Sequence, residues 1–179
     1  DGSTDGTPDK IRTWESRSNV RLVQRQEKPD LTASILAGTA TAKSDVIVVM
    51  DADLSHPPER LSAVVTPVLD GTHDVVVGSR YIAGGNTENW PLHRQLLSRI
   101  GGWIARPICD VNDATSGFFA FRRELTASIS NHAHGYKILL ELLMANQGKL
   151  RVTEVPIIFH DRTHGTSKLS FSHQRAYIQ

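Results

Sequence analysis

Two acidic residues with the spacing of a metal site, Asp51 and Asp53, directly follow the β-branched run Val46–Met50. Such a run predicts a strand buried on both faces, and ligands of open α/β sheets bind beyond the carboxyl ends of the strands. If the chain stays extended, the two carboxylates point the same way and offer hard oxygen ligands to Mg²⁺ or Mn²⁺, which would bridge a diphosphate. An ordinary Asp-rich turn is the competing interpretation. The position behind a buried strand favours the metal.

A second segment that could bind an anion lies at the start of the chain, in DGSTDGT. Gly2 and Ser3 precede a predicted helix, and Pro8 suits the first turn of that helix. Such a segment either cradles a phosphate or forms a plain capped turn. No Gly-Lys-Ser/Thr follows and no GxGxxG occurs, which excludes a Walker A loop and a dinucleotide-binding fingerprint.

Three cations follow predicted strands. Arg80 comes after a strand predicted over 74–77, and Arg162 and Lys168 come after a strand predicted over 152–159. A guanidinium group can bind phosphate through two parallel hydrogen bonds. The competing interpretation is that these cations are solvated loop residues.

A basic segment without acidic residues, 90–108, predicts a helix over 90–104. Arg94 and Ser98 share one face of this helix, and its apolar residues share another. Two interpretations are equally supported. The helix either lies at a membrane interface or packs on the core with solvated arginines.

The elements that must position these residues alternate along the first half of the chain. Strands are predicted over 20–23, 46–50 and 74–77, and helices over 9–16, 32–42 and 59–69. This alternation predicts a parallel α/β sheet with crossover helices. The second half predicts strands over 117–121 and 152–159 and a helix over 136–147. Pro156 indicates that the last strand is at an edge, and the absence of a long linker predicts one domain over 1–179.

Composition excludes several classes of protein. The chain has 179 residues, 39% of them hydrophobic, and a net charge of +1, so it is not a nucleic-acid binder that relies on bulk positive charge. A single cysteine excludes an internal disulfide framework and a Cys-rich zinc site. No run of about 18 apolar residues occurs, so no helix of this chain is predicted to span a membrane.

The motifs occur in one order along nearly the whole chain: DGSTDGT, MDADLSHPPE, VVGSRY, NWPLHR, TSGF, GYKILLELL and SKLS. In this order the chain resembles the polyprenyl-phosphate (dolichyl-phosphate) mannosyltransferases of glycosyltransferase family 2. The resemblance implies a mostly parallel, Rossmann-like GT-A sheet with flanking helices. It also implies inverting transfer of mannose from GDP-mannose to a polyprenyl monophosphate, with Mg²⁺ or Mn²⁺. The family begins with a strand carrying a P-x-Y-N-E motif, and we expect a chain trimmed at its N-terminus that lacks this strand.

The resemblance also implies roles for individual residues. The metal would be held by Asp51, Asp53 and Ser55. The nucleotide sugar would be bound by Asp1, Gly2, Ser3, Asp51 and Asp53. The acceptor phosphate would be bound by Arg80, Arg94, Ser98, Arg162 and Lys168. The catalytic residues would be Asp53, Arg80 and Asp113.

Three positions depart from the family pattern. Ser55 stands where many relatives have Gln, and Ala114 where the family usually has Pro. Asp30 replaces a Gly, so we expect it to stiffen its loop or to repel the donor phosphates.

Two alternatives stay open. One is transfer from UDP-glucose to the same acceptor, and the other is a non-catalytic remnant that binds nucleotide sugars. The resemblance further implies a peripheral place at the cytoplasmic face of a membrane, through the helix within 90–108, and no nucleic-acid partner.

Overall fold

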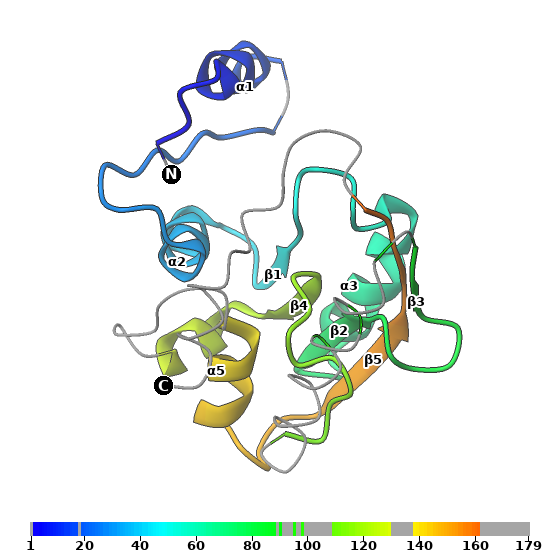
Figure 1. Ribbon diagram of the computed structural model, residues 1–179. Coiled ribbons are helices and arrows are strands. Elements are labelled where there is room, and N and C mark those ends of the chain that lie inside the picture. The colour runs from blue at the N-terminus through cyan, green and yellow to red at the C-terminus, as the bar shows by residue number, and fades with distance from the viewer. Residues whose placement is uncertain are drawn as a thin grey trace.

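The central feature of the fold is a four-stranded sheet with the order β1-β4-β2-β5. Its strands are β1 (Val46–Val49), β2 (Val75–Ser79), β4 (Phe119–Arg122) and β5 (Val152–Pro156). A second, short sheet joins β3 (Asn86–Thr87) to β6 (Ile158–Phe159) (Figure 1). The structure is a computed structural model that describes residues 2–17, 19–88, 90, 95, 98, 109–129 and 138–161.

The sheet is mixed in direction. β5 pairs with β2 in parallel, whereas β4 is antiparallel to both β1 and β2. The prediction of parallel strands is therefore right for β1, β2 and β5, and β4 departs from it. As a result, the amino end of β4 lies at the same edge of the sheet as the carboxyl ends of β1 and β2.

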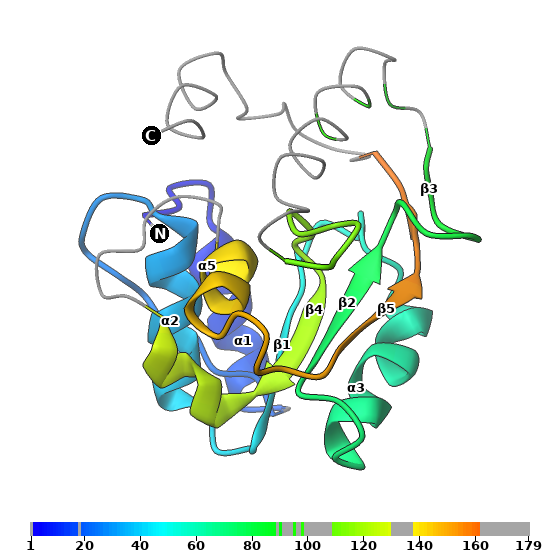
Figure 2. The same ribbon diagram turned by 90° about the horizontal axis from the view of Figure 1, so that it is seen from below.

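The helices α2 (Leu31–Thr41), α3 (Leu61–Leu69) and α5 (Ile138–Ala145) cover the two faces of the sheet. The helix α1 (Thr7–Glu15) has no buried residue and lies away from the sheet (Figure 1), and 3₁₀ turns occur over Pro58–Arg60 and Arg123–Ser128. Figure 2 shows α2 and α5 on one side of the sheet and α3 on the other. Each helix lies within a few residues of its predicted range.

The two-sided core explains why the strands are continuous apolar runs. Val75, Val77, Phe119 and Phe121 point to the core shared with α5. The residues between them, Val76 and Ala120, point to the core shared with α3, as does Phe118 just before β4. Because successive side chains of a strand point to opposite faces, a strand covered on both sides needs apolar residues at every position. Pro156 lies in β5, at the edge of the sheet, as predicted.

The predicted strand over 20–23 does not form in the described part of the chain. Val20 and Val23 are exposed, and no ladder pairs this segment with another strand there. β1 is an edge strand, and a groove lined by Ile35, Gly38, Thr39, Ala42 and residues 46–50 runs between it and α2. A strand requires partners for its backbone N–H and C=O groups, so local β propensity alone does not create one.

Asp30 has a local structural role. Its carboxylate accepts the Ala33 backbone N–H at 2.8 Å and caps the N-terminus of α2. Such a cap typically stabilises a helix by about 1 kcal/mol, so Asp30 contributes to folding besides its expected effect on the donor phosphates.

The helices formed by the described residues are all too short or too polar to cross a membrane.

Candidate active site

Several of the predicted site residues gather at one edge of the sheet because of the direction of β4. Asp51 and Asp53 follow β1, and Arg80 follows β2. Asp113 belongs to the loop that precedes β4, and this loop reaches the same edge because β4 runs against its neighbours. Three segments far apart in the sequence thus meet without a direct pairing of β1 with β2.

The loop after β1 is closed by its own side chains. Asp53 Oδ1 accepts the Ser55 backbone N–H at 3.0 Å and the Ser55 hydroxyl at 2.5 Å. The Ser55 carbonyl accepts the His160 backbone N–H at 3.0 Å, which ties the loop to the residue after β6. Ser55 is buried, so it contributes to the shape of this loop as well as an oxygen atom.

Leu54 has an unusual backbone at the tip of this loop. Its φ is 62°, in the left-handed region that residues with a Cβ rarely adopt, and Leu54 is 69% exposed. The conformation turns the chain between Asp53 and Ser55. It therefore accompanies the hydrogen bonds that bring Ser55 back to Asp53.

The acidic pair suits a hard divalent cation. The Asp51 side chain is 40% exposed, and the Asp53 carboxylate, which accepts two hydrogen bonds from Ser55, is a group with about four acceptor positions. Within the described ranges, no group of three or more His, Cys, Asp or Glu side chains gathers as a metal site. Two carboxylates fit Mg²⁺ or Mn²⁺ only if a phosphate ligand completes the coordination, which is the usual arrangement for Mg²⁺.

His56 lies beneath the acidic pair. Its Nδ1 accepts the Asp51 backbone N–H at 3.1 Å, so the ring is neutral with its proton on Nε2. Burial, together with the nearby Arg80 guanidinium, lowers the pKa of His56 to about 4. A ring in this state does not supply a general base at neutral pH.

Arg80 and Asp113 form a buried ion pair. The guanidinium donates from Nε to Oδ2 at 2.7 Å and from Nη2 to Oδ1 at 2.6 Å, and the Arg80 backbone N–H also reaches Oδ2. Arg80 is 8% exposed and Asp113 is 0% exposed. Burial acts to lower the pKa of Arg80, but the Asp113 carboxylate outweighs burial and raises the pKa above its ordinary value. The arginine is therefore a fixed, charged group rather than a mobile surface cation.

Aromatic rings surround the same guanidinium. Its carbon lies 5.1 Å from the Tyr81 ring centre, 5.5 Å from that of Trp90 and 5.7 Å from that of Phe159. Tyr81 in turn donates its hydroxyl hydrogen to Ser98 Oγ at 2.6 Å. Ser98 is thereby linked to the surroundings of Arg80, although its contact is with tyrosine.

Glu154 fixes the loop that carries Asp113. Its carboxylate accepts the backbone N–H groups of Asn112 and Asp113 at 2.9 and 3.1 Å, and the Asn112 side-chain amide at 2.6 Å. Ser116 adds a bond to the Gly78 carbonyl at 2.6 Å, which fastens the loop to β2. Sequence reasoning missed Glu154. The available signal was that Glu154 is the one charged residue in the predicted strand segment at 152–159.

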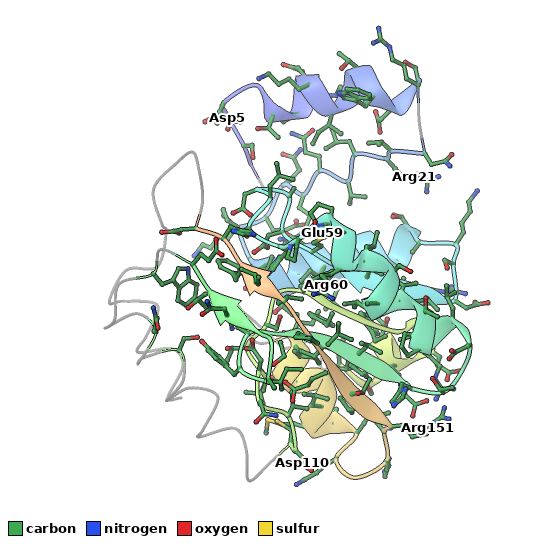
Figure 3. All side chains as sticks on the ribbon, turned by 90° about the vertical axis from the view of Figure 1, so that its right-hand side faces the viewer. Asp5, Arg21, Glu59, Arg60, Asp110 and Arg151 are labelled. Carbon is green, nitrogen blue, oxygen red and sulfur yellow. The ribbon has the colours of Figure 1, made fainter. Side chains whose placement is uncertain are left out.

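A second ion cluster lies at the amino end of β2. Asp74 accepts hydrogen bonds from Arg151 Nε and Nη2 and forms an ion pair with Arg122 at 2.9 Å. Hydrogen bonding to Arg151 is the main cause that lowers the pKa of Asp74. Figure 3 shows Arg151 where β5 begins, away from Glu59 and Arg60 at the start of α3. This cluster secures the sheet at the end opposite the candidate site.

The predicted site residues thus fall into four groups, one of which is Ser98 alone, bonded to Tyr81 beside Arg80. Brought together at the edge are Asp51, Asp53, Ser55, Arg80 and Asp113. Gly2 and Ser3 are exposed, and no hydrogen bond or ion pair between described residues joins them to the acidic pair. Outside the described residues lie Asp1, Arg94, Arg162 and Lys168.

This fold and site define the chain as an α/β enzyme of the Rossmann-like GT-A class. A structure of glucosyl-3-phosphoglycerate synthase from Mycobacterium tuberculosis has the same fold, with a TM-score of 0.70 over 99% of this chain and 64% of that one, at 22% identity. The family model described as Glycosyl transferase family 2 matches residues 1–129, and the chain belongs to that family.

Relatives with curated names align with most of this chain. It is 41% identical over 174 residues to the dolichol-phosphate mannosyltransferase of Pyrococcus furiosus, covering 94% of this chain and 49% of that protein. It is 33% identical over 188 residues to the dolichol-phosphate mannosyltransferase of Saccharomyces cerevisiae, covering 100% of this chain and 70% of that protein. The chain therefore spans about half the length of the first relative and a larger part of the second.

Proposed function

We propose that residues 1–179 form a single catalytic domain that transfers mannose from GDP-mannose to a polyprenyl or dolichyl monophosphate with inversion. The observation that carries the proposal is the meeting of a partly exposed acidic pair with a fixed arginine at one edge of the sheet. The names of the relatives that match nearly the whole chain support the substrate class.

The acidic pair is the proposed site of Mg²⁺ or Mn²⁺. Asp51 and Asp53 would hold the ion, with the Ser55 hydroxyl beside them, and the bound ion neutralises charge on a departing nucleoside diphosphate. A related fold, the glucosyl-3-phosphoglycerate synthase of Mycobacterium tuberculosis, was solved with Mn²⁺ and uridine-diphosphate-glucose, which supports a divalent ion here. The same structure makes UDP-glucose the second donor to test.

The acceptor needs no strong base. A phosphate monoester with a second pKa near 6 is mostly ionised at pH 7, so its oxygen is already a nucleophile. This agrees with His56, whose Nδ1 is occupied by the Asp51 N–H. The demand on the protein is to hold two anions together, which arginine does through charge and directed hydrogen bonds.

Arg80 is the described residue best suited to that task. Asp113, Thr115 and the aromatic rings fix its orientation, while Nη1 makes no hydrogen bond within the described ranges. We propose that Nη1 binds the acceptor phosphate. Arg94, Arg162 and Lys168 would complete the phosphate site, with Ser98 beside Tyr81.

Association with a membrane is a separate proposal. The basic segment 90–108 would hold the protein peripherally at the cytoplasmic face of a membrane. Leu96→Glu combined with Trp103→Glu should abolish binding to liposomes that contain anionic lipid. Unchanged binding would remove this part of the proposal.

The test of activity uses Mg²⁺, a short polyprenyl phosphate and labelled GDP-mannose or UDP-glucose in parallel. Asp51→Asn should abolish transfer of label to the organic-extractable lipid. Asp45→Asn is the matched control, since Asp45 precedes β1, is almost fully exposed and pairs only weakly with Arg123 at 3.1 Å. It should keep wild-type turnover.

The donor that yields labelled lipid decides between the alternatives. Label from GDP-mannose alone supports the proposal, and label from UDP-glucose alone changes the donor while keeping the site. Absence of label from both donors favours the non-catalytic nucleotide-sugar-binding alternative.

A further inference from the structure

His56 is placed to control the first residue of the acidic pair. β1 ends its ladder at Val49, which pairs with Phe119, so the Asp51 N–H lies beyond the regular strand pairing. His56 Nδ1 accepts this N–H at 3.1 Å. The backbone that carries the Asp51 carboxylate is thus anchored by a side chain rather than by the sheet.

The His56 ring has little freedom to move. It is 2% exposed, and it lies against Phe118 with ring centres 5.5 Å apart and against Phe159 at 5.1 Å. Gly117 closes a further side, because a Cβ there would come within 3.2 Å of His56 Cε1. The ring is therefore held by packing, and its nitrogen is a fixed point for the loop.

The Asp51 side chain is more exposed than the His56 ring. It is 40% exposed, and its Oδ2 lies 3.9 Å from His56 Nδ1, beyond hydrogen-bond distance. His56 therefore acts on Asp51 through the backbone, whose position decides where the side chain begins. Ser55 acts on Asp53 through the carboxylate itself.

We propose that His56 is a positioning residue that sets the Asp51 carboxylate for a divalent cation by accepting the Asp51 backbone N–H. This inference rests on the proposed function, which places the ion at Asp51 and Asp53. Residues that orient metal ligands from behind typically change metal affinity by about 10- to 100-fold when they are replaced.

Two substitutions of His56 separate the effect of losing the hydrogen-bond acceptor from the effect of losing the ring. His56→Asn places an amide oxygen near the position of Nδ1, so it can still accept the Asp51 N–H. His56→Phe keeps an aromatic ring between Phe118 and Phe159 but has no acceptor. His73→Phe is the matched control, because His73 precedes Asp74 at the opposite end of β2.

The measurement is Mn²⁺ binding, followed by the electron paramagnetic resonance signal of the free ion, with GDP present at a fixed concentration. We expect His56→Phe to weaken Mn²⁺ binding by about 10- to 100-fold, His73→Phe to leave it unchanged, and His56→Asn to retain most of the affinity. Circular dichroism melts without metal show whether each variant is folded. A purely structural role predicts that His56→Asn binds Mn²⁺ no better than His56→Phe, because His56→Phe keeps the ring packing that His56→Asn loses.

The possible results are distinguishable. Wild-type affinity in folded His56→Phe overturns the inference, and so does equal weakening of His56→Asn and His56→Phe. If Asp51→Asn loses Mn²⁺ while His56→Phe keeps it, the proposed metal site stands and only the role of His56 is wrong. A wild-type chain that binds no Mn²⁺ overturns both.

Discussion

Removing the charge of Asp113 leaves the Arg80 guanidinium buried without its counter-ion. We expect Asp113→Asn to lower the free energy of unfolding by about 3–5 kcal/mol, the usual cost of breaking one side of a buried pair. Asp113 is 0% exposed and Arg80 is 8% exposed, so water does not replace the lost partner. Asparagine keeps the volume and one acceptor for the Arg80 backbone N–H, 3.0 Å from Oδ2 in the wild type. The loss is therefore mainly electrostatic.

This cost is large enough to measure by melting. For a chain of this length each kcal/mol moves Tm by about 2–4 °C, so Asp113→Asn should lower Tm by roughly 6–20 °C. Urea denaturation followed by circular dichroism gives the free energy itself. Arg80→Met, added to Asp113→Asn, removes the unpaired cation, and the double variant should be more stable than Asp113→Asn alone.

Two results would refute this reasoning. One is a folded Asp113→Asn chain that melts within about 2 °C of the wild type, since that difference corresponds to less than about 1 kcal/mol. The other is a double variant that is less stable than Asp113→Asn. Either would mean that the guanidinium is not a buried charge in need of this carboxylate.

Three further predictions concern the framework of the site. Gly78→Ala places a methyl group 2.8 Å from Phe118 Cδ1, so urea denaturation should show a loss of about 1–3 kcal/mol. Hydrogen bonds from Arg151 lower the pKa of Asp74 in the folded chain. The stabilisation is therefore complete above the unfolded pKa of about 3.9 and is lost as the pH falls through the lower folded value. Asp74→Asn should thus destabilise the chain at pH 7 and flatten the fall in stability toward pH 2. Glu154→Gln removes one acceptor from the loop before β4, so unfolding free energy should drop by about 1–3 kcal/mol and turnover should drop with it. Unchanged stability and turnover would contradict the role given to Glu154.

The elements that the sequence predicts well are those decided by burial. The runs at 46–50 and 75–77 are apolar at every position, and both form strands covered on two faces. The segment at 20–23 has similar local propensity but forms no strand in the described residues, because pairing depends on a neighbour. The antiparallel direction of β4 is also set by pairing, and the period of its side chains carries no information about direction.

In the candidate site too, some features can be predicted from the sequence and others depend on how the strands pair. The acidic pair is recognisable because Asp51 and Asp53 follow a buried strand. The direct pairing of Arg80 with Asp113 is not recognisable, since it depends on the insertion of β4 between β1 and β2. The sequence predicts a role for Arg80 and for Asp113 separately, but only the strand order shows that they form an ion pair.

The position of β4 also has a consequence for the order of folding. β1 pairs with β4 through Val46 and Arg122, and β2 pairs only with β4 and β5, so neither early strand has a sheet partner close in sequence. Contacts of such long separation slow folding, because the entropy of closing a long loop is lost before the contact forms. During synthesis, β1 and β2 leave the ribosome with unpaired edges well before β4 is made, and unpaired edges are the usual starting points of aggregation. A chain released before Phe119 would contain the acidic pair of the site but not the strand that completes its sheet.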